Sequence, residues 1–131
     1  MLCREQVRTE KGLDMSGSIS YHSGLAAEDT VADLYLRSGH EIAARRWRSA
    51  AGEIDLIARK NDDIIFIEVK KSRSFAGAAE ALSARQMARI RKSAEVYLGD
   101  QPQGLNSNAR FDVALVNGQG AVSVLENAIT A

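Results

Sequence analysis

The chain has 131 residues, of which 45% are hydrophobic and 26% charged, as expected for one globular domain with a buried core. Its 17 lysine and arginine residues balance its 17 aspartate and glutamate residues, so the formal net charge is zero. No apolar run is long enough to span a bilayer, and the amino terminus lacks the apolar stretch of a secretory signal. The single cysteine, Cys3, excludes an internal disulfide. We therefore expect a cytoplasmic protein.

The charge is unevenly distributed along the chain. The stretch from Arg37 to Lys92 contains 13 basic and 7 acidic residues. A basic zone is typical of a surface that binds a polyanion, although a solvated charged face fits it equally well. The basic residues that we expect to contact a nucleic-acid backbone are Arg45, Arg46, Arg48, Lys71, Arg73, Arg85 and Arg89.

The first part of the chain is predicted to contain a tail, a helix and a strand. Residues 1–23 are polar and without periodicity, so we expect a weakly ordered tail before a single domain over residues 24–131. A helix is predicted from about Gly24 to Ser38, because its apolar residues form one side and a glycine follows it. His40 to Arg48 is predicted to form a strand.

The next segment predicts a β-hairpin with a defined register. Two strand-like runs, Ile54 to Ala58 and Ile64 to Lys70, flank the turn residues Lys60 to Asp63. A turn centred between Asn61 and Asp62 would place Asp55 opposite Glu68, and Glu53 opposite Lys70.

Because side chains alternate across a strand, this hairpin should have two unlike faces. One face is wholly apolar and must be buried; it carries Ile54, Leu56, Ala58, Ile65, Ile67 and Val69. The other face is apolar near the turn, and at its far end it carries Glu53, Asp55, Glu68 and Lys70.

The rest of the chain completes an α/β pattern. A loop is predicted over Ser72 to Ala81, a helix over Ser83 to Leu98 and a loop over Asp100 to Ala109. Two more strands are predicted at Phe111 to Val116 and Ala121 to Leu125. The order α β β β α β β indicates a mixed sheet of about five strands flanked by helices.

The acidic end of the hairpin suggests chemistry. Three carboxylates close together repel one another, and such clusters are commonly neutralised by a bound divalent cation. Oxygen ligands favour Mg²⁺ or Mn²⁺. Lys70 lies two residues beyond Glu68 and projects to the same face, and a cation with a nearby ammonium suits phosphodiester hydrolysis. Spacing alone favours a simpler interpretation, a salt-bridged edge in which Lys70 neutralises Glu53 and Glu68, because these residue types are common.

Two motifs carry a family resemblance. The stretch Gly52-Glu53-Ile54-Asp55-Leu56-Ile57-Ala58, followed by Phe66-Ile67-Glu68-Val69-Lys70, resembles the YraN-like family of bacterial proteins. That family is similar to the PD-(D/E)xK, or restriction-endonuclease-like, superfamily, and especially to the archaeal Holliday-junction resolvases. The resemblance covers the chain from about Gly24 onward and implies a restriction-endonuclease-like fold.

The resemblance also implies roles for individual residues. Asp55 and Glu68 match metal-binding and catalytic positions, and Lys70 matches the motif lysine. Val69 would offer its carbonyl to the metal, Glu28 matches an acidic residue that reaches the site, and Glu53 could bind a second cation or pair with Lys70 or Arg48. The chain departs from the pattern in two places: Ile54 replaces the proline before the aspartate, and Arg85-Gln86 stands where relatives tend to have Lys-Gln.

The resemblance implies a Mg²⁺- or Mn²⁺-dependent endonuclease that hydrolyses phosphodiester bonds of DNA. The analogy with the resolvases points further to branched or structured DNA and to a homodimer. The alternative is a non-catalytic nucleic-acid-binding module or scaffold in DNA processing, because a fold does not fix a function.

Overall fold

The computed structural model of the protein describes residues 16–80 and 83–128, so Cys3 and residues 1–15 of the expected tail lie outside the described residues. The elements are, in chain order, α1 (Ser16–Arg37), β1 (Glu41–Ser49), β2 (Gly52–Lys60), β3 (Asp63–Lys71), α2 (Phe75–Glu80), α3 (Ala84–Gly99), a 3₁₀ turn (Gly104–Asn106), β4 (Ala109–Val116) and β5 (Val122–Leu125). None of the helices in these described segments combines the length and hydropathy needed to cross a lipid bilayer.

The strands form one five-stranded sheet in the order β1-β2-β3-β4-β5. Neighbouring strands are antiparallel except β3 and β4, which are parallel. A parallel pair needs a long crossover, and α2 and α3 occupy it. This confirms the expected α/β class with a mixed sheet.

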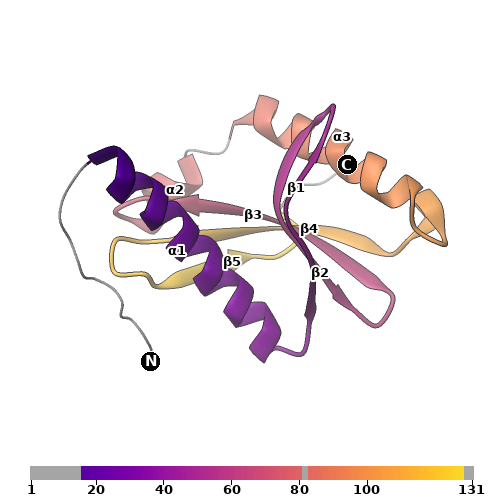
Figure 1. The fold of residues 1–131 in the computed structure, drawn as a ribbon, viewed down its shortest axis with the longest axis horizontal. Coiled ribbons are helices and arrows are strands. Elements are labelled where there is room, and N and C mark those ends of the chain that lie inside the picture. Colours follow the sequence, from indigo (N-terminus) through magenta and orange to yellow (C-terminus); the bar gives the residue numbers. More distant parts are fainter. Residues whose placement is uncertain (1–15, 81–82, 129–131) are drawn as a thin grey trace.

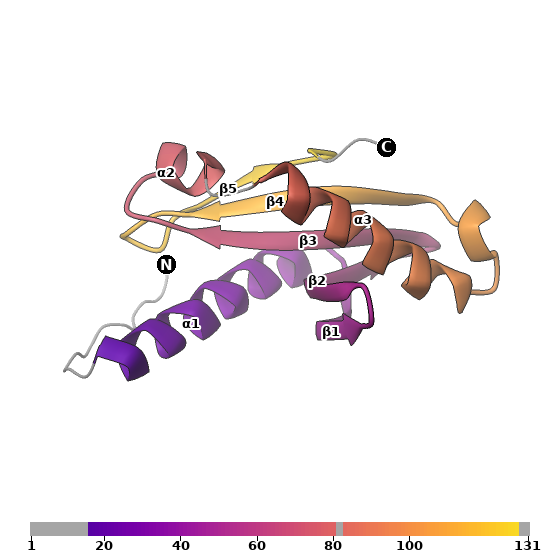
Figure 2. The same ribbon diagram turned by 90° about the horizontal axis from the view of Figure 1, so that it is seen from above.

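Helices cover both faces of the sheet (Figures 1 and 2). On one face, α1 buries Val31 and Tyr35 against a cluster that includes Leu56 and Ile67. On the other face, α2 and α3 pack on the sheet, α3 with a stripe of three buried apolar residues, Ile90, Ala94 and Leu98. The strands that carry the acidic motif therefore lie at the centre of a three-layer arrangement.

Two elements differ from the sequence-based expectation. The first helix begins at Ser16 rather than near Gly24, so residues 16–23, expected to belong to the tail, are helical. The expected loop after β3 contains α2, whose first turn is fixed because the Gly77 N–H donates to Ser74 Oγ at 3.1 Å. Ala78 is fully buried in this helix. That burial stabilises a short helix which periodicity could not reveal.

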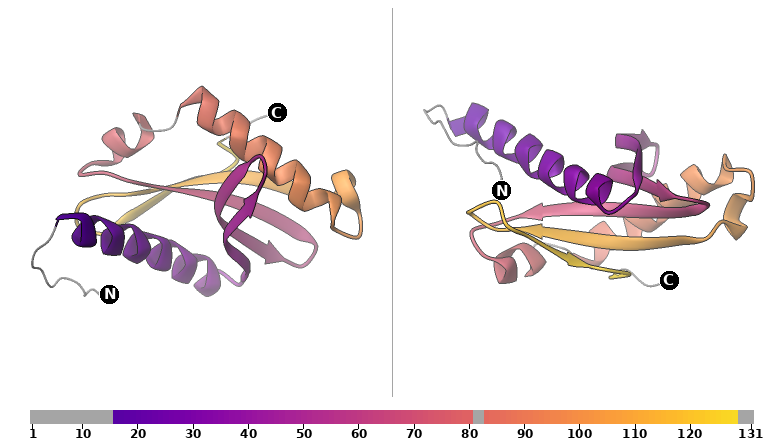
Figure 3. Two further views of the ribbon diagram at one scale, coloured as in Figure 1. Left: turned by 45° about the horizontal axis from the view of Figure 1, so that its top comes forward. Right: turned by 90° about the horizontal axis from the view of Figure 1, so that it is seen from below.

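The β1–β2 hairpin turns out of the plane of β3 and β4 (Figure 3). Two cross-strand pairs, Ala44 with Ile57 and Trp47 with Ile54, pack in the same cluster on the α3 side although they lie three residues apart on each strand. Arg46, between them, has a left-handed backbone with φ of 50°. Leu56 packs in the other cluster, on the α1 side, so the expectation that Ile54 and Leu56 share one face is wrong: the alternation of side chains is broken between them.

Candidate active site

The predicted hairpin register brings the two motif acids together. β2 and β3 pair Leu56 with Ile67 through Lys60 with Asp63, as the turn chemistry predicted. At Asp55, the residue before Leu56, the side chain takes part in the strand pairing: its Oδ2 accepts a hydrogen bond from the Val69 N–H of β3 at 2.9 Å. The carboxyl groups of Asp55 and Glu68 are close enough for each to shift the pKa of the other.

Burial raises the affinity of both acids for protons, and the charge of Asp55 raises that of Glu68 further. Glu68 is only 6% exposed, and this burial, followed by the negative charge of Asp55, raises the pKa of Glu68 to about 8. Burial also raises the pKa of Asp55, while the Val69 N–H acts in the opposite direction. Ionising both carboxyl groups in this site is therefore unfavourable, and a bound cation would offset the repulsion between the two negative charges.

Lys70 and Gln86 both contact Glu68. Lys70 Nζ lies 3.4 Å from Glu68 Oε2, and Gln86 Nε2 donates to the same oxygen at 2.7 Å. Lys70 comes from the same strand two residues on, whereas Gln86 comes from the first turn of α3, which Ser83 caps by accepting the Gln86 N–H at 3.1 Å. The strand and the helix therefore hold Glu68 from two directions.

Sequence reasoning did not assign Gln86 a role. Ser83 followed by Gln86 fits a capping box, in which the glutamine side chain would return to the Ser83 N–H. The structure instead directs this side chain to Glu68. The crossover after β3 brings α3 to this position, and local sequence does not encode it.

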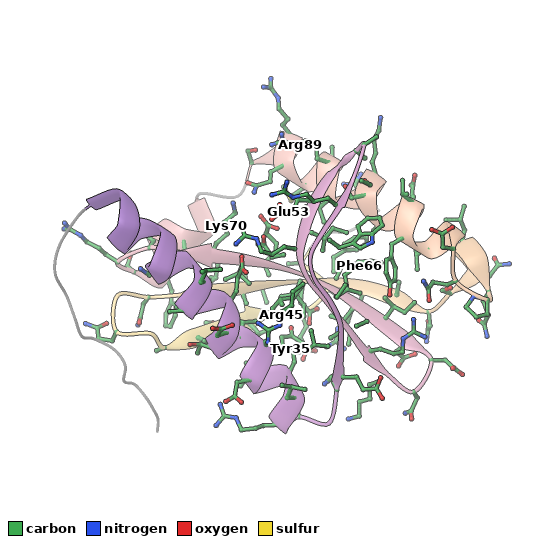
Figure 4. The ribbon with its side chains drawn as sticks, viewed as in Figure 1. Tyr35, Arg45, Glu53, Phe66, Lys70 and Arg89 are labelled. Carbon is green, nitrogen blue, oxygen red and sulfur yellow. The ribbon has the colours of Figure 1, made fainter. Side chains whose placement is uncertain are left out.

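Asp55, Glu68 and Gln86 line a cleft of about 250 Å³ between the start of β2 and the first turns of α3. Figure 4 labels Glu53, Lys70 and Arg89 in this region. The lining residues are Gly52, Glu53, Asp55, Glu68, Gln86, Arg89 and Ile90. This volume accommodates a hydrated cation together with one phosphate group.

Two further acids are expected near the metal, Glu53 and Glu28. Glu53 pairs with Arg48 at 2.9 Å, one of the partners expected for it, and with Arg46 at 3.7 Å. Glu28 is near enough for the charge of Asp55, after burial, to raise its pKa. Across residues 16–80 and 83–128, no three His, Cys, Asp or Glu side chains gather in a metal-binding arrangement. Roles in metal binding for Glu28, Glu53 and the Val69 carbonyl remain predictions.

The expected basic residues fall into two groups. Arg89 lines the cleft, and Arg46 and Arg48 reach its edge through Glu53. Arg45 instead pairs with Asp29 of α1 at 2.7 Å. The other three are exposed and are not among the described residues that line the cleft: Lys71, Arg73 and Arg85.

The donor set fits a hard divalent cation. Two carboxylates that repel each other meet in a half-buried cleft, and oxygen donors are the ligands that Mg²⁺ and Mn²⁺ prefer. Fold and cleft thus define a class: α/β proteins that present an Asp…Glu-x-Lys cluster from two neighbouring strands.

The chain belongs to the uncharacterised protein family UPF0102, whose model matches residues 27–116. A UPF0102 protein of Cereibacter sphaeroides is 56% identical over 117 residues, covering 89% of this chain and 100% of that protein. A UPF0102 protein of Ruegeria pomeroyi is 48% identical and covers 90% of this chain and 96% of its own length. The family membership expected from the two motifs is confirmed.

One solved structure is also similar. The crystal structure of a repair endonuclease from Pyrococcus abyssi aligns with 86% of this chain at 17% sequence identity and a TM-score of 0.41. This chain spans 42% of that protein. A similarity at this level does not by itself define a common fold.

Proposed function

We propose that the protein is a metal-dependent nuclease that hydrolyses phosphodiester bonds of DNA at the cleft formed by Asp55, Glu68 and Lys70. The observation that supports this most directly is that two carboxyl groups line a single small cleft and that the Lys70 ammonium lies 3.4 Å from one of them. Membership of UPF0102 is compatible with this function without specifying it.

Each residue has a definite task in this proposal. Asp55 and Glu68 would hold Mg²⁺ or Mn²⁺, which supplies positive charge to polarise the phosphodiester and to activate water. Lys70, whose side chain is 18% exposed, would bind a non-bridging oxygen and stabilise the charge that develops there. Gln86 would fix the orientation of the Glu68 carboxylate through its bond to Oε2.

A cleavage screen tests the proposal. Linear, nicked, flapped and four-way DNA, with RNA for comparison, would be incubated with the protein and Mn²⁺. Wild type should cut at least one form, and Asp55→Ala and Lys70→Ala should each reduce the rate by about 10²- to 10³-fold. Cutting of branched forms in preference to linear duplex would support the analogy with resolvases.

Matched substitutions identify the source of any activity. Glu95→Ala, on an exposed part of α3, should cut as wild type does. If the Asp55 and Lys70 variants cut equally well, the activity belongs to a contaminant and the proposal is wrong. If wild type binds DNA and cuts none of the forms, a non-catalytic nucleic-acid-binding module becomes the better interpretation.

A further inference from the structure

Glu53 makes an unusual contact at the edge of the cleft. Each of its carboxylate oxygens faces a different arginine of β1: Oε1 lies 2.9 Å from Arg48 Nε, and Oε2 lies 3.7 Å from Arg46 Nε. The first contact is a hydrogen bond and the second is an ion pair too long for one. One carboxylate therefore bridges two guanidinium groups.

Both arginines approach Glu53 through Nε, and this leaves the terminal Nη groups out of the contact. A guanidinium has five N–H donors in a planar fork, and the Nη side suits the paired oxygens of a phosphate. The side chains of Arg48 and Arg46 are 75% and 41% exposed, so these donors can be reached from solvent. The three charges sum to one positive charge at the cleft edge.

The backbone of Arg46 indicates that this placement is maintained at a cost. Its φ of 50° is left-handed although the residue lies in a strand. Arginine is strained in this conformation, which glycine and, to a lesser degree, asparagine adopt at lower energy. Strained backbone is concentrated at functional sites. The same irregularity separates Arg46 from Arg45, which turns to Asp29 on α1.

We propose that Glu53 is a positioning residue that holds Arg46 and Arg48 as a paired binding site for DNA backbone phosphates, and that it is not a metal ligand. The inference rests on the proposed nuclease function. Glu53 lines the same cleft as Asp55 and Glu68, so phosphates held by the pair would flank the bond presented to those acids. One of its oxygens accepts a hydrogen bond from Arg48 and the other faces Arg46, so a cation would have to compete with two arginines for this carboxylate.

If Glu53 positions the two arginines, its removal should change DNA affinity in the opposite direction from that expected if only net charge matters. Removing a negative charge near bound phosphates should tighten DNA binding if only net charge matters. Removing the anchor of two arginines should weaken binding despite the gain in positive charge. Loss of a metal ligand would leave metal-free DNA binding unimpaired and would lower the affinity for the metal.

The test measures binding of a short fluorescein-labelled DNA duplex by fluorescence anisotropy in EDTA, where no cleavage occurs. Glu53→Ala should bind about three- to tenfold more weakly than Glu95→Ala, which changes the net charge equally at an exposed site on α3. The slope of log affinity against log salt concentration should fall by about 1 to 2, as expected for lost phosphate contacts. Affinity for Mn²⁺ alone, measured by calorimetry, should be unchanged.

A double-mutant cycle completes the test. In an Arg46→Ala/Arg48→Ala background, Glu53→Ala should have no further weakening effect, because the residues that it positions are absent. DNA binding by Glu53→Ala as tight as or tighter than that of Glu95→Ala would overturn the inference, and so would a loss of Mn²⁺ affinity. Failure of the nuclease proposal is recognised separately, since wild type would then bind the duplex but cut none of the linear, nicked, flapped and four-way forms in Mn²⁺.

Discussion

At the scale of single residues, Glu68 carries the largest electrostatic cost in the cleft. Its carboxyl group is buried, accepts a hydrogen bond from Gln86, and has Lys70 at 3.4 Å. Burial, followed by the negative charge of Asp55, nevertheless outweighs Lys70 and raises the pKa of Glu68 to about 8. Ionisable groups with strongly raised pKa values are concentrated at functional sites, where they reduce the stability of the protein but serve ligand binding.

This pKa predicts how stability depends on pH without metal. The ordinary pKa of the glutamate is 4.5, so between pH 4.5 and about 8 the folded protein holds a proton that the unfolded chain has lost. The free energy of unfolding should therefore fall as pH rises through this window. Glu68→Gln should unfold at higher urea than wild type at pH 8 in EDTA, with little difference at pH 5.

Glu95→Gln is the matched control, because it replaces an exposed carboxylate on α3 by the same amide. Its urea midpoint should follow that of wild type at both pH values. A Glu68→Gln midpoint that tracks wild type from pH 5 to pH 8 would contradict the raised pKa.

At the scale of elements, sequence predicted the β2–β3 hairpin because two local rules act together. Turn residues fix the centre, and strict alternation fixes the register, so the pairing of Leu56 with Ile67 and the approach of Asp55 to Glu68 followed. Long-range contacts decide the rest. The bend of β1–β2, the burial of Ala78 in α2 and the bond from Gln86 to Glu68 all depend on tertiary packing.

The bend at Arg46 makes a prediction about backbone strain. At a left-handed position, glycine is more favourable than alanine by about 1 kcal/mol, the reverse of the usual order in a strand. Arg46→Gly should therefore be more stable to urea than Arg46→Ala. Both variants lose the same ion pair with Glu53, so their difference reports only the backbone.

Ala109 of β4 offers the opposite case in the same sheet, since it is exposed, pairs with Ile64 of β3 and is not among the residues with positive φ. Ala109→Gly should lose about 0.5 to 1 kcal/mol. Equal or greater stability of Arg46→Ala relative to Arg46→Gly would show that Arg46 is not strained in solution.

At the scale of the whole molecule, a buried carboxylate joins segments that are distant in sequence. Asp112 of β4 is fully buried and accepts hydrogen bonds from Tyr35 of α1 at 2.6 Å, from Arg110 at 3.0 and 3.1 Å, and from the Asn127 N–H at 3.0 Å. Burial and the bond to Asp112 raise the pKa of Tyr35, so its hydroxyl keeps the proton that it donates. The network fixes α1, which carries Glu28, to the sheet that carries the cleft.

Tyr35→Phe tests how much this connection contributes. The variant keeps the ring that packs in the α1-side cluster and removes one donor to a buried charge, which should cost about 1 to 3 kcal/mol of unfolding free energy in urea. Tyr97→Phe is the control, because that ring packs against Trp47 and Phe66 and a phenylalanine preserves these contacts; it should change stability by less than about 0.5 kcal/mol. If Tyr35→Phe costs no more than Tyr97→Phe, the Asp112 network does not hold α1. The position of Glu28 near the cleft would then depend on apolar packing and on the ion pair between Arg45 and Asp29.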